Sequence, residues 1–93
     1  MVLAGEIDIA SAPKLREAGT RVVGALKEGD ELQVDLSDVD FVDSSGLGAL
    51  IAIRNEAETL RHQIVLINIS PSILRLFELT GLSSSFTLLP RAE

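Results

Sequence analysis

The chain has 93 residues, of which 46% are hydrophobic and only 3% aromatic, and its formal net charge at pH 7 is -6. A chain of this length forms one small domain, and its acidic balance excludes nucleic acid as a partner, since phosphate backbones require a basic surface. Because the sequence has no cysteine, no leader-like segment and no apolar run of about 20 residues, it predicts a cytoplasmic protein without disulfides, thiolate metal sites or membrane insertion.

The first third of the chain predicts a strand, a loop and a helix. Residues 2–4 form a short apolar strand that ends at Gly5, and residues 6–12 follow as a loop. Pro13 suits the first turn of a helix, and apolar residues then recur at helical spacing to about Lys27. The order of the first elements is therefore strand and then helix.

The middle of the chain repeats this order. Residues 32–36 alternate apolar with polar side chains, which is typical of a strand. Residues 37–40, with two aspartates, predict a turn. A second helix is expected from Ser44 or Ser45 to near His62, because apolar residues again recur at helical spacing.

The last third predicts a buried strand, a short helix and a final strand. Residues 64–67 are an uninterrupted apolar run, as in a central strand. Residues 68–70 form a loop whose last serine caps a helix that begins at Pro71 and has Gly81 as its C-cap. Residues 86–89 complete the pattern, which predicts an α/β fold with a mixed, mostly parallel sheet of about four strands and helices packed on it.

The segment FVDSSGLGAL, residues 41–50, places two serines where the second helix begins. Ser44 or Ser45 can act as the N-cap by accepting a hydrogen bond from a free backbone N–H. Alternatively, a serine there can carry a phosphate, because a helix N-terminus favours negative charge. Gly46 and Gly48 allow close approach either of the sheet or of a second molecule, so local physics leaves both interpretations open.

The same segment lacks the features of an enzyme. It contains no G-x-S-x-G, and the chain has no phosphate-binding glycine loop. His62, the single histidine, lies about five helical turns from Ser44 and cannot act as its base.

A hard metal ion is a further alternative, carried by four aspartates: Asp35, Asp38, Asp40 and Asp43. Their spacing departs from a calcium loop, because Val42 takes the place of a ligand, so we interpret them as turn-forming and capping residues. The sequence predicts no catalytic residue, no metal and no cofactor.

Three segments resemble the STAS domains of bacterial anti-sigma factor antagonists. They are, in collinear order, LAGEIDIASAPKLREA (3–18), VDSSGLGAL (42–50) and ISPSILRLFELTGL (69–82). The likeness covers almost the whole chain and implies one STAS domain over residues 1–93, with the N-terminal strand of the family shortened or missing. That difference implies an exposed sheet edge, through which the chain could form a homodimer.

The resemblance implies a protein switched by phosphorylation. Members of this family bind an anti-sigma factor that is also a serine kinase and thereby free the sigma factor. The kinase phosphorylates the first serine of the signature, here Ser44, and a PP2C-type phosphatase restores it. The residues implied in partner binding are Asp8, Asp43, Ser44, Ser45, Gly46, Leu47 and Gly48. Asp8 would lie in a loop beside the site, Asp43 would orient Ser44, and residues 46–48 would form a smooth docking surface.

Two other functions stay open on the sequence. STAS domains also occur as subunits of ABC-type lipid transporters or of stress-sensing assemblies, and some are never phosphorylated. A small enzyme or nucleotide-binding domain would need a basic residue near the glycine loop, and none follows residue 43 until Arg54. The neighbouring genes would distinguish the first alternative, and a thermal-shift screen with nucleotides would distinguish the second.

Overall fold

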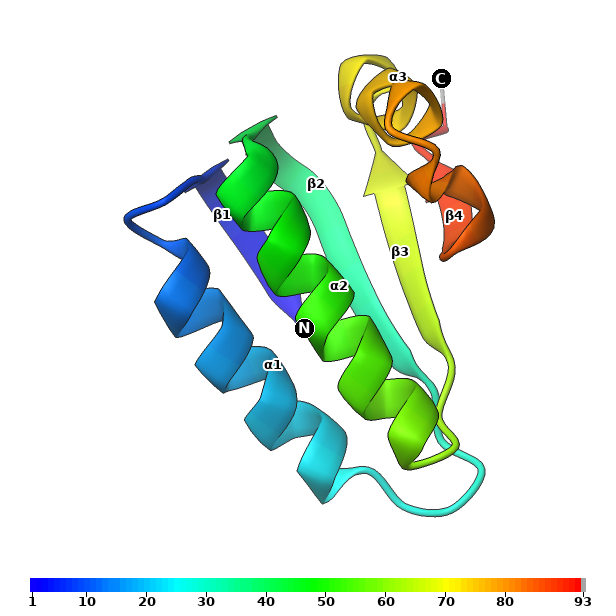
Figure 1. Cartoon of the computed structure of the whole chain (residues 1–93). Helices are drawn as coiled ribbons and strands as arrows, with labels where there is room; N and C mark the ends of the chain where they lie inside the picture. The colour runs from blue at the N-terminus through cyan, green and yellow to red at the C-terminus, as the bar shows by residue number, and fades with distance from the viewer. Residues whose placement is uncertain (93) are drawn as a thin grey trace.

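The protein, analysed as a computed structural model that describes residues 1–92, alternates strands and helices (Figure 1). The elements are β1 (Val2–Ile7), α1 (Ala12–Ala25), β2 (Leu32–Val42), α2 (Ser44–Thr59), β3 (Ile64–Ile69), α3 (Pro71–Leu79), the 3₁₀ turn η1 (Leu82–Ser84) and β4 (Thr87–Pro90). The four strands form one sheet in the order β1-β2-β3-β4, and every neighbouring pair is parallel. The α/β prediction is confirmed, but a mixed sheet is wrong, because each helix returns the chain to run in the same direction.

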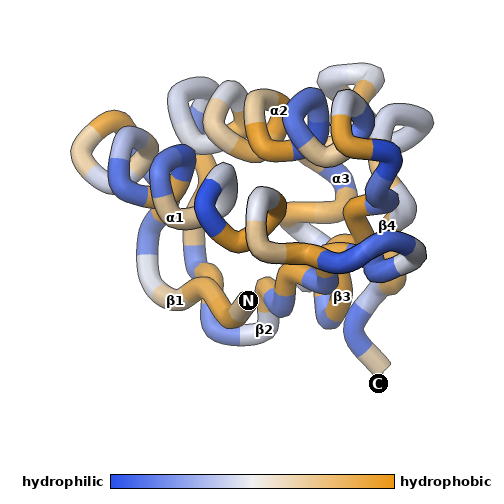
Figure 2. The backbone as a smooth tube through the Cα atoms, turned by 90° about the horizontal axis from the view of Figure 1, so that it is seen from below, coloured by the Kyte–Doolittle hydropathy of each residue, from blue (hydrophilic) through white to orange (hydrophobic). Residues whose placement is uncertain are grey.

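All three helices lie on one face of the sheet, as Figure 2 shows from below. Each strand is the neighbour in the sheet of the strand that precedes it in the sequence. When all crossovers between such parallel strands have the same hand, every connecting helix lies on the same face of the sheet. The other face is left without a helical layer, and β2 alternates accordingly. Leu32 and Val34 are buried under the helices, whereas Gln33 is exposed on the open face. This one-sided layering explains why a parallel strand shows a period of two.

The core fills the space between the sheet and the helices. Its largest fully buried side chains are Phe77, Leu36, Leu50, Ile53, Leu66, Ile69, Val23 and Val34. The rings of Phe77 and Phe86 meet edge to face with centroids 5.5 Å apart, which ties α3 to the segment before β4. Helices α1 and α2 pack closely where Gly19 contacts Ile53.

The predicted turn at residues 37–40 is wrong, because β2 continues through it. β1 also extends past Gly5, which adopts a φ of 76°, with a register shift before Glu6. Val39 and Val42 are buried, and Val42 pairs with Ile7. Pairing with β1 and burial of these valines therefore outweigh the local turn preference of the aspartates.

Both long helices end earlier than predicted. α1 ends at Ala25 instead of Lys27, and α2 ends at Thr59. His62, near which the second helix was expected to end, is only 8% exposed, and its Nδ1 lies 2.8 Å from the carbonyl oxygen of Asp30. The earlier helix end lets the imidazole ring turn inward against the loop that precedes β2.

The predicted loop at residues 68–70 is wrong in its first part, since β3 continues to Ile69. Asn68 adopts a φ of 57° at an irregularity in the ladder, a conformation that asparagine tolerates. Its side-chain amide donates to the Asp35 carboxylate at 3.2 Å, and Ser37 N–H donates to the same oxygen at 2.9 Å. The backbone hydrogen bond from Ser37, followed by side-chain bonds from Ser37 and Asn68, lowers the pKa of Asp35. Ser70 caps the N-terminus of α3 as predicted, but the C-cap is Thr80 and not Gly81, which precedes the 3₁₀ turn η1.

β1 and β4 form the two edges of the sheet. β1 is the edge at which the sequence predicts pairing with a second copy, and that homodimer stays a prediction. Over residues 1–92, none of the helices has both the length and the apolar character needed to cross a membrane.

The contact between α1 and α2 gives a stability prediction. A Cβ added at Gly19 would overlap the side chain of the buried Ile53, so Gly19→Ala should lower the free energy of unfolding by about 1–2 kcal/mol. Gly24 lies in the same helix but faces open space, so Gly24→Ala should raise it by up to about 1 kcal/mol. Urea unfolding measures the free energy of unfolding of both variants. If both substitutions raised it equally, α1 and α2 would be able to move apart and accommodate the added methyl group at position 19.

Candidate functional site

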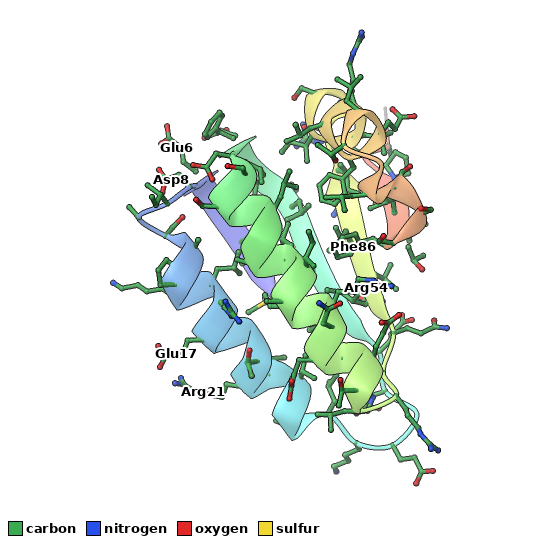
Figure 3. All side chains as sticks on the ribbon, viewed as in Figure 1. Glu6, Asp8, Glu17, Arg21, Arg54 and Phe86 are labelled. Carbon is green, nitrogen blue, oxygen red and sulfur yellow. The ribbon has the colours of Figure 1, made fainter. Side chains whose placement is uncertain are left out.

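The carboxyl ends of β1 and β2 bring the loop at residues 8–11 beside the start of α2. In a parallel sheet these ends lie on one edge, where connecting loops form binding sites. The backbone N–H of Asp43 donates to the Ile7 carbonyl at 3.0 Å, which joins the two strand ends. Figure 3 shows Glu6 and Asp8 at this edge, next to the first turn of α2.

The Asp43 carboxylate connects these two segments. Its Oδ1 accepts from the backbone N–H of Gly46 at 2.9 Å, and its Oδ2 accepts from the N–H of Ile9 at 3.2 Å. Asp43 is therefore the N-cap of α2, and the prediction that Ser44 or Ser45 is the cap is wrong. One carboxylate both starts the helix and ties the 8–11 loop to it.

Ser44 is the first residue of α2, and its side chain is exposed. Within residues 1–92 its hydroxyl makes no hydrogen bond, to Asp43 or to any other residue, so it is free to interact with another molecule. Ser45 follows in the same turn and is half-buried. Since the Asp43 carboxylate accepts the capping hydrogen bond, helix capping does not explain why a serine occupies position 44.

The three residues expected to form a smooth docking surface point in different directions. Gly46 is buried, and a Cβ there would overlap the Ile7 carbonyl oxygen and lie 2.7 Å from the Ile7 Cγ2. Leu47 is buried in the core. Gly48 is exposed and has open space where a Cβ would stand. Gly46 therefore lets the helix approach β1, Leu47 is buried in the core, and of these three residues only Gly48 is available to a partner.

Asp8 lies in the loop beside the site, as the resemblance implies, but its carboxylate is turned into that loop. Its Oδ1 accepts from the N–H groups of Ala10 at 3.0 Å and Ser11 at 3.1 Å. Its carbonyl accepts from Ala12 N–H at 2.8 Å, at the start of α1. Asp8 thus shapes the loop, and its negative charge remains near the start of α2.

Two exposed apolar side chains at this edge were not predicted as site residues. Ile9 is 76% exposed and is held at the site by its hydrogen bond to Asp43. Phe41 is 50% exposed and lies two residues before Asp43. Large apolar side chains in water beside a free hydroxyl are typical of a surface that a protein partner covers. The signal in the sequence was an isoleucine in a polar loop and one of only three phenylalanines.

The arrangement offers an acceptor hydroxyl, and His62 lies beyond the opposite end of α2, too far away to act as its base. Among residues 1–92, no three His, Cys, Asp or Glu side chains are grouped so as to hold a metal ion. The aspartates weighed as metal ligands instead lie along β2 or cap α2. Of the two serines in the first turn of α2, Ser44 is exposed and Ser45 is half-buried.

Comparisons with a family model, with related sequences and with solved structures agree with one another. The family model for the STAS domain matches residues 1–93. The chain is 42% identical to an anti-sigma-B factor antagonist of Listeria monocytogenes over 81 residues, which is 87% of this chain and 69% of the relative. It is 35% identical to the anti-sigma-B factor antagonist of Bacillus subtilis, over 98% of this chain and 81% of the relative. The solved structure of the Bacillus cell fate determinant SpoIIAA in its phosphorylated form has the same fold, with a TM-score of 0.72 and 24% identity over 99% of this chain and 80% of SpoIIAA.

The assignment of the cap predicts a difference between two neighbouring substitutions. Asp43→Ala removes the acceptor for Gly46 and Ile9 and should lower the free energy of unfolding by about 1–2 kcal/mol. Ser44→Ala removes no internal hydrogen bond and should change it by less than about 0.5 kcal/mol. Urea denaturation followed by circular dichroism measures both, and a Ser44→Ala loss as large as that of Asp43→Ala would contradict the assignment.

Proposed function

Because the chain belongs to the STAS domain family, we propose that it is an anti-sigma factor antagonist whose binding is switched off by phosphorylation of Ser44. The proposal rests on one observation: Ser44 presents an exposed hydroxyl, without an internal partner in residues 1–92, at the N-terminus of α2. The relatives in Listeria and Bacillus are named as antagonists of an anti-sigma factor, and SpoIIAA has been solved in a phosphorylated form.

In this proposal the chain is a ligand and substrate, not an enzyme. The anti-sigma factor acts as the kinase and supplies ATP, the metal and the catalytic base. The Ser44 oxygen attacks the γ-phosphorus of ATP, the bond from that phosphorus to the ADP oxygen breaks, and the hydroxyl proton passes to the base of the kinase. Such a step requires an acceptor oxygen that a foreign active site can reach, and exposure of Ser44 supports this role.

The start of α2 makes the phosphorylated state stable within the chain and unfavourable at the interface. The free N–H groups and the positive end of the helix dipole favour a phosphate on the first helical residue. The phosphate adds about -1.5 to -2 charges in a region that already carries Asp43, the N-cap of α2, together with Asp8 and Glu6 (Figure 3). A partner that covers the neutral hydroxyl would have to desolvate this charge, which costs several kcal/mol of binding.

Reversal requires a second enzyme, since the single histidine of the sequence, His62, lies beyond the far end of α2 and cannot activate a water molecule at phosphorylated Ser44. A PP2C-type phosphatase would remove the phosphate and return Ser44 to its neutral form. The two partners would therefore recognise the same edge of the sheet in its two states, with Ile9 and Phe41 as the apolar contacts around it.

The proposal predicts a specific labelling pattern. Incubated with the cognate anti-sigma factor and Mg-ATP, the wild-type chain should gain one phosphate in its intact mass, and Ser44→Ala should gain none. The matched control is Ser45→Ala, which should still be phosphorylated because only the neighbouring hydroxyl is removed. Calorimetry should show that the phosphorylated chain binds the anti-sigma factor at least about tenfold more weakly, a loss of about 1.4 kcal/mol or more. Equal labelling of Ser44→Ala and wild type would overturn the proposal.

A further inference from the structure

A groove of about 860 Å³ lies between α1 and α2, directly beside the phosphorylation site. Ala12, Pro13 and Ala49 supply apolar surface to it, and the exposed Ile9 stands at its end. Ser45 and Gly48 line its α2 side, so the groove begins within one turn of Ser44. The small side chains on α2 keep this side of the groove low and open.

The groove follows α1 for just over two helical turns, at about 3.6 residues per turn. Ala12, Arg16 and Thr20, which are four residues apart, lie on one side of α1 and all line the groove. At 1.5 Å per residue, the helical run from Ala12 to Thr20 spans about 12 Å. A shallow apolar channel of this length between two helices suits a third helix that lays its own apolar side into it.

The charge of α1 differs in sign from that of the rest of the chain. α1 contains three basic residues, Lys14, Arg16 and Arg21, and one acidic residue, Glu17. The whole chain has 8 basic and 14 acidic residues, which leaves five basic and thirteen acidic residues outside α1. The groove therefore lies along the basic helix of an acidic protein.

Arg16 is the cation that remains available at the groove. Arg21 is already paired with Glu17 at 3.1 Å, and Figure 3 shows both side chains on α1. Arg16 also lines the groove, is exposed, and makes no ion pair with any other residue in 1–92. A charged group without an internal partner, beside apolar surface, favours an occupant that carries a carboxylate next to an apolar side.

We propose that the α1–α2 groove binds an amphipathic helix of the anti-sigma factor, with apolar side chains between the two helices and an acidic side chain on Arg16. This inference rests on the proposed function and adds a second contact region to it. Ser44 supplies the switch, and the groove supplies contact area that phosphorylation does not alter. The partner helix would have its apolar residues three to four positions apart and its acidic residues along one flank.

Two substitutions in the groove, each with a matched control, test the proposal by calorimetry with the full chain and the cognate anti-sigma factor. Thr20→Trp fills the groove away from Ser44 and should weaken binding at least about tenfold, or about 1.4 kcal/mol. Gly24→Trp adds the same side chain into open space on the same helix and should stay within about twofold. Urea unfolding shows whether each variant is folded.

The charge is tested separately. Arg16→Glu should also weaken binding about tenfold, whereas Arg75→Glu makes the same change in net charge on the exposed side of α3 and should stay within about twofold. Raising the salt from about 0.1 M to 1 M shortens the screening length from about 10 Å to 3 Å, so wild-type binding should weaken more than that of Arg16→Glu.

The outcomes separate this inference from the function on which it rests. If the wild type binds the anti-sigma factor and Ser44 is labelled, but Thr20→Trp and Arg16→Glu bind like their controls, the groove proposal is wrong and the proposed function stands. If the wild type neither binds nor is labelled, the proposed function fails and the groove proposal fails with it. If sedimentation shows a dimer that only the groove variants disrupt, while partner binding is unchanged, the occupant is a second copy of this chain and the proposal is overturned.

Discussion

The two hydrogen bonds accepted by the Asp43 carboxylate organise the whole candidate site. One bond, from Gly46, starts α2, and the other, from Ile9, fixes the loop that leads into α1. Because Asp43 supplies the cap, Ser44 is not used internally within residues 1–92 and remains exposed to solvent. A single side chain thus determines where the helix begins, where the loop lies and which hydroxyl is available to another molecule.

The one-sided arrangement of helices explains why the site and the groove share a surface. Parallel strands added in sequence place α1 and α2 next to each other over β1 and β2. Close contact at Gly19 and Gly46 brings the two helices and the sheet together in the interior, whereas Gly48 leaves the outer side open. The same packing of two helices on one face of the sheet therefore produces a dense core and a shallow external groove that begins beside Ser45 at the start of α2.

Several local preferences lose to long-range pairing in this fold. The aspartates at 38 and 40 favour a turn, but β1 provides a partner for that stretch, and the buried Val39 and Val42 fix it as a strand. Asn68 likewise favours a loop, yet it is accommodated as an irregularity within β3 by its bond to Asp35. In both cases the partner is the preceding strand, but a whole helix separates the two strands along the chain, so no short window of local residues contains the information.

The sequence by itself determined the α/β alternation, the helix over the DSSG segment and the cap of α3, because hydrophobic period and capping chemistry act over a few residues. It also pointed to Ser44, Asp8 and Asp43 as neighbours through its resemblance to a family. Only the tertiary structure decided that Asp43 caps α2 in place of Ser44 or Ser45, that Gly46 and Leu47 face inward, and that Ile9 and Arg16 border a groove. These features depend on contacts between segments that are distant in the sequence. Which backbone amides a carboxylate reaches, and which side of a helix is buried, are fixed only when those segments pack together.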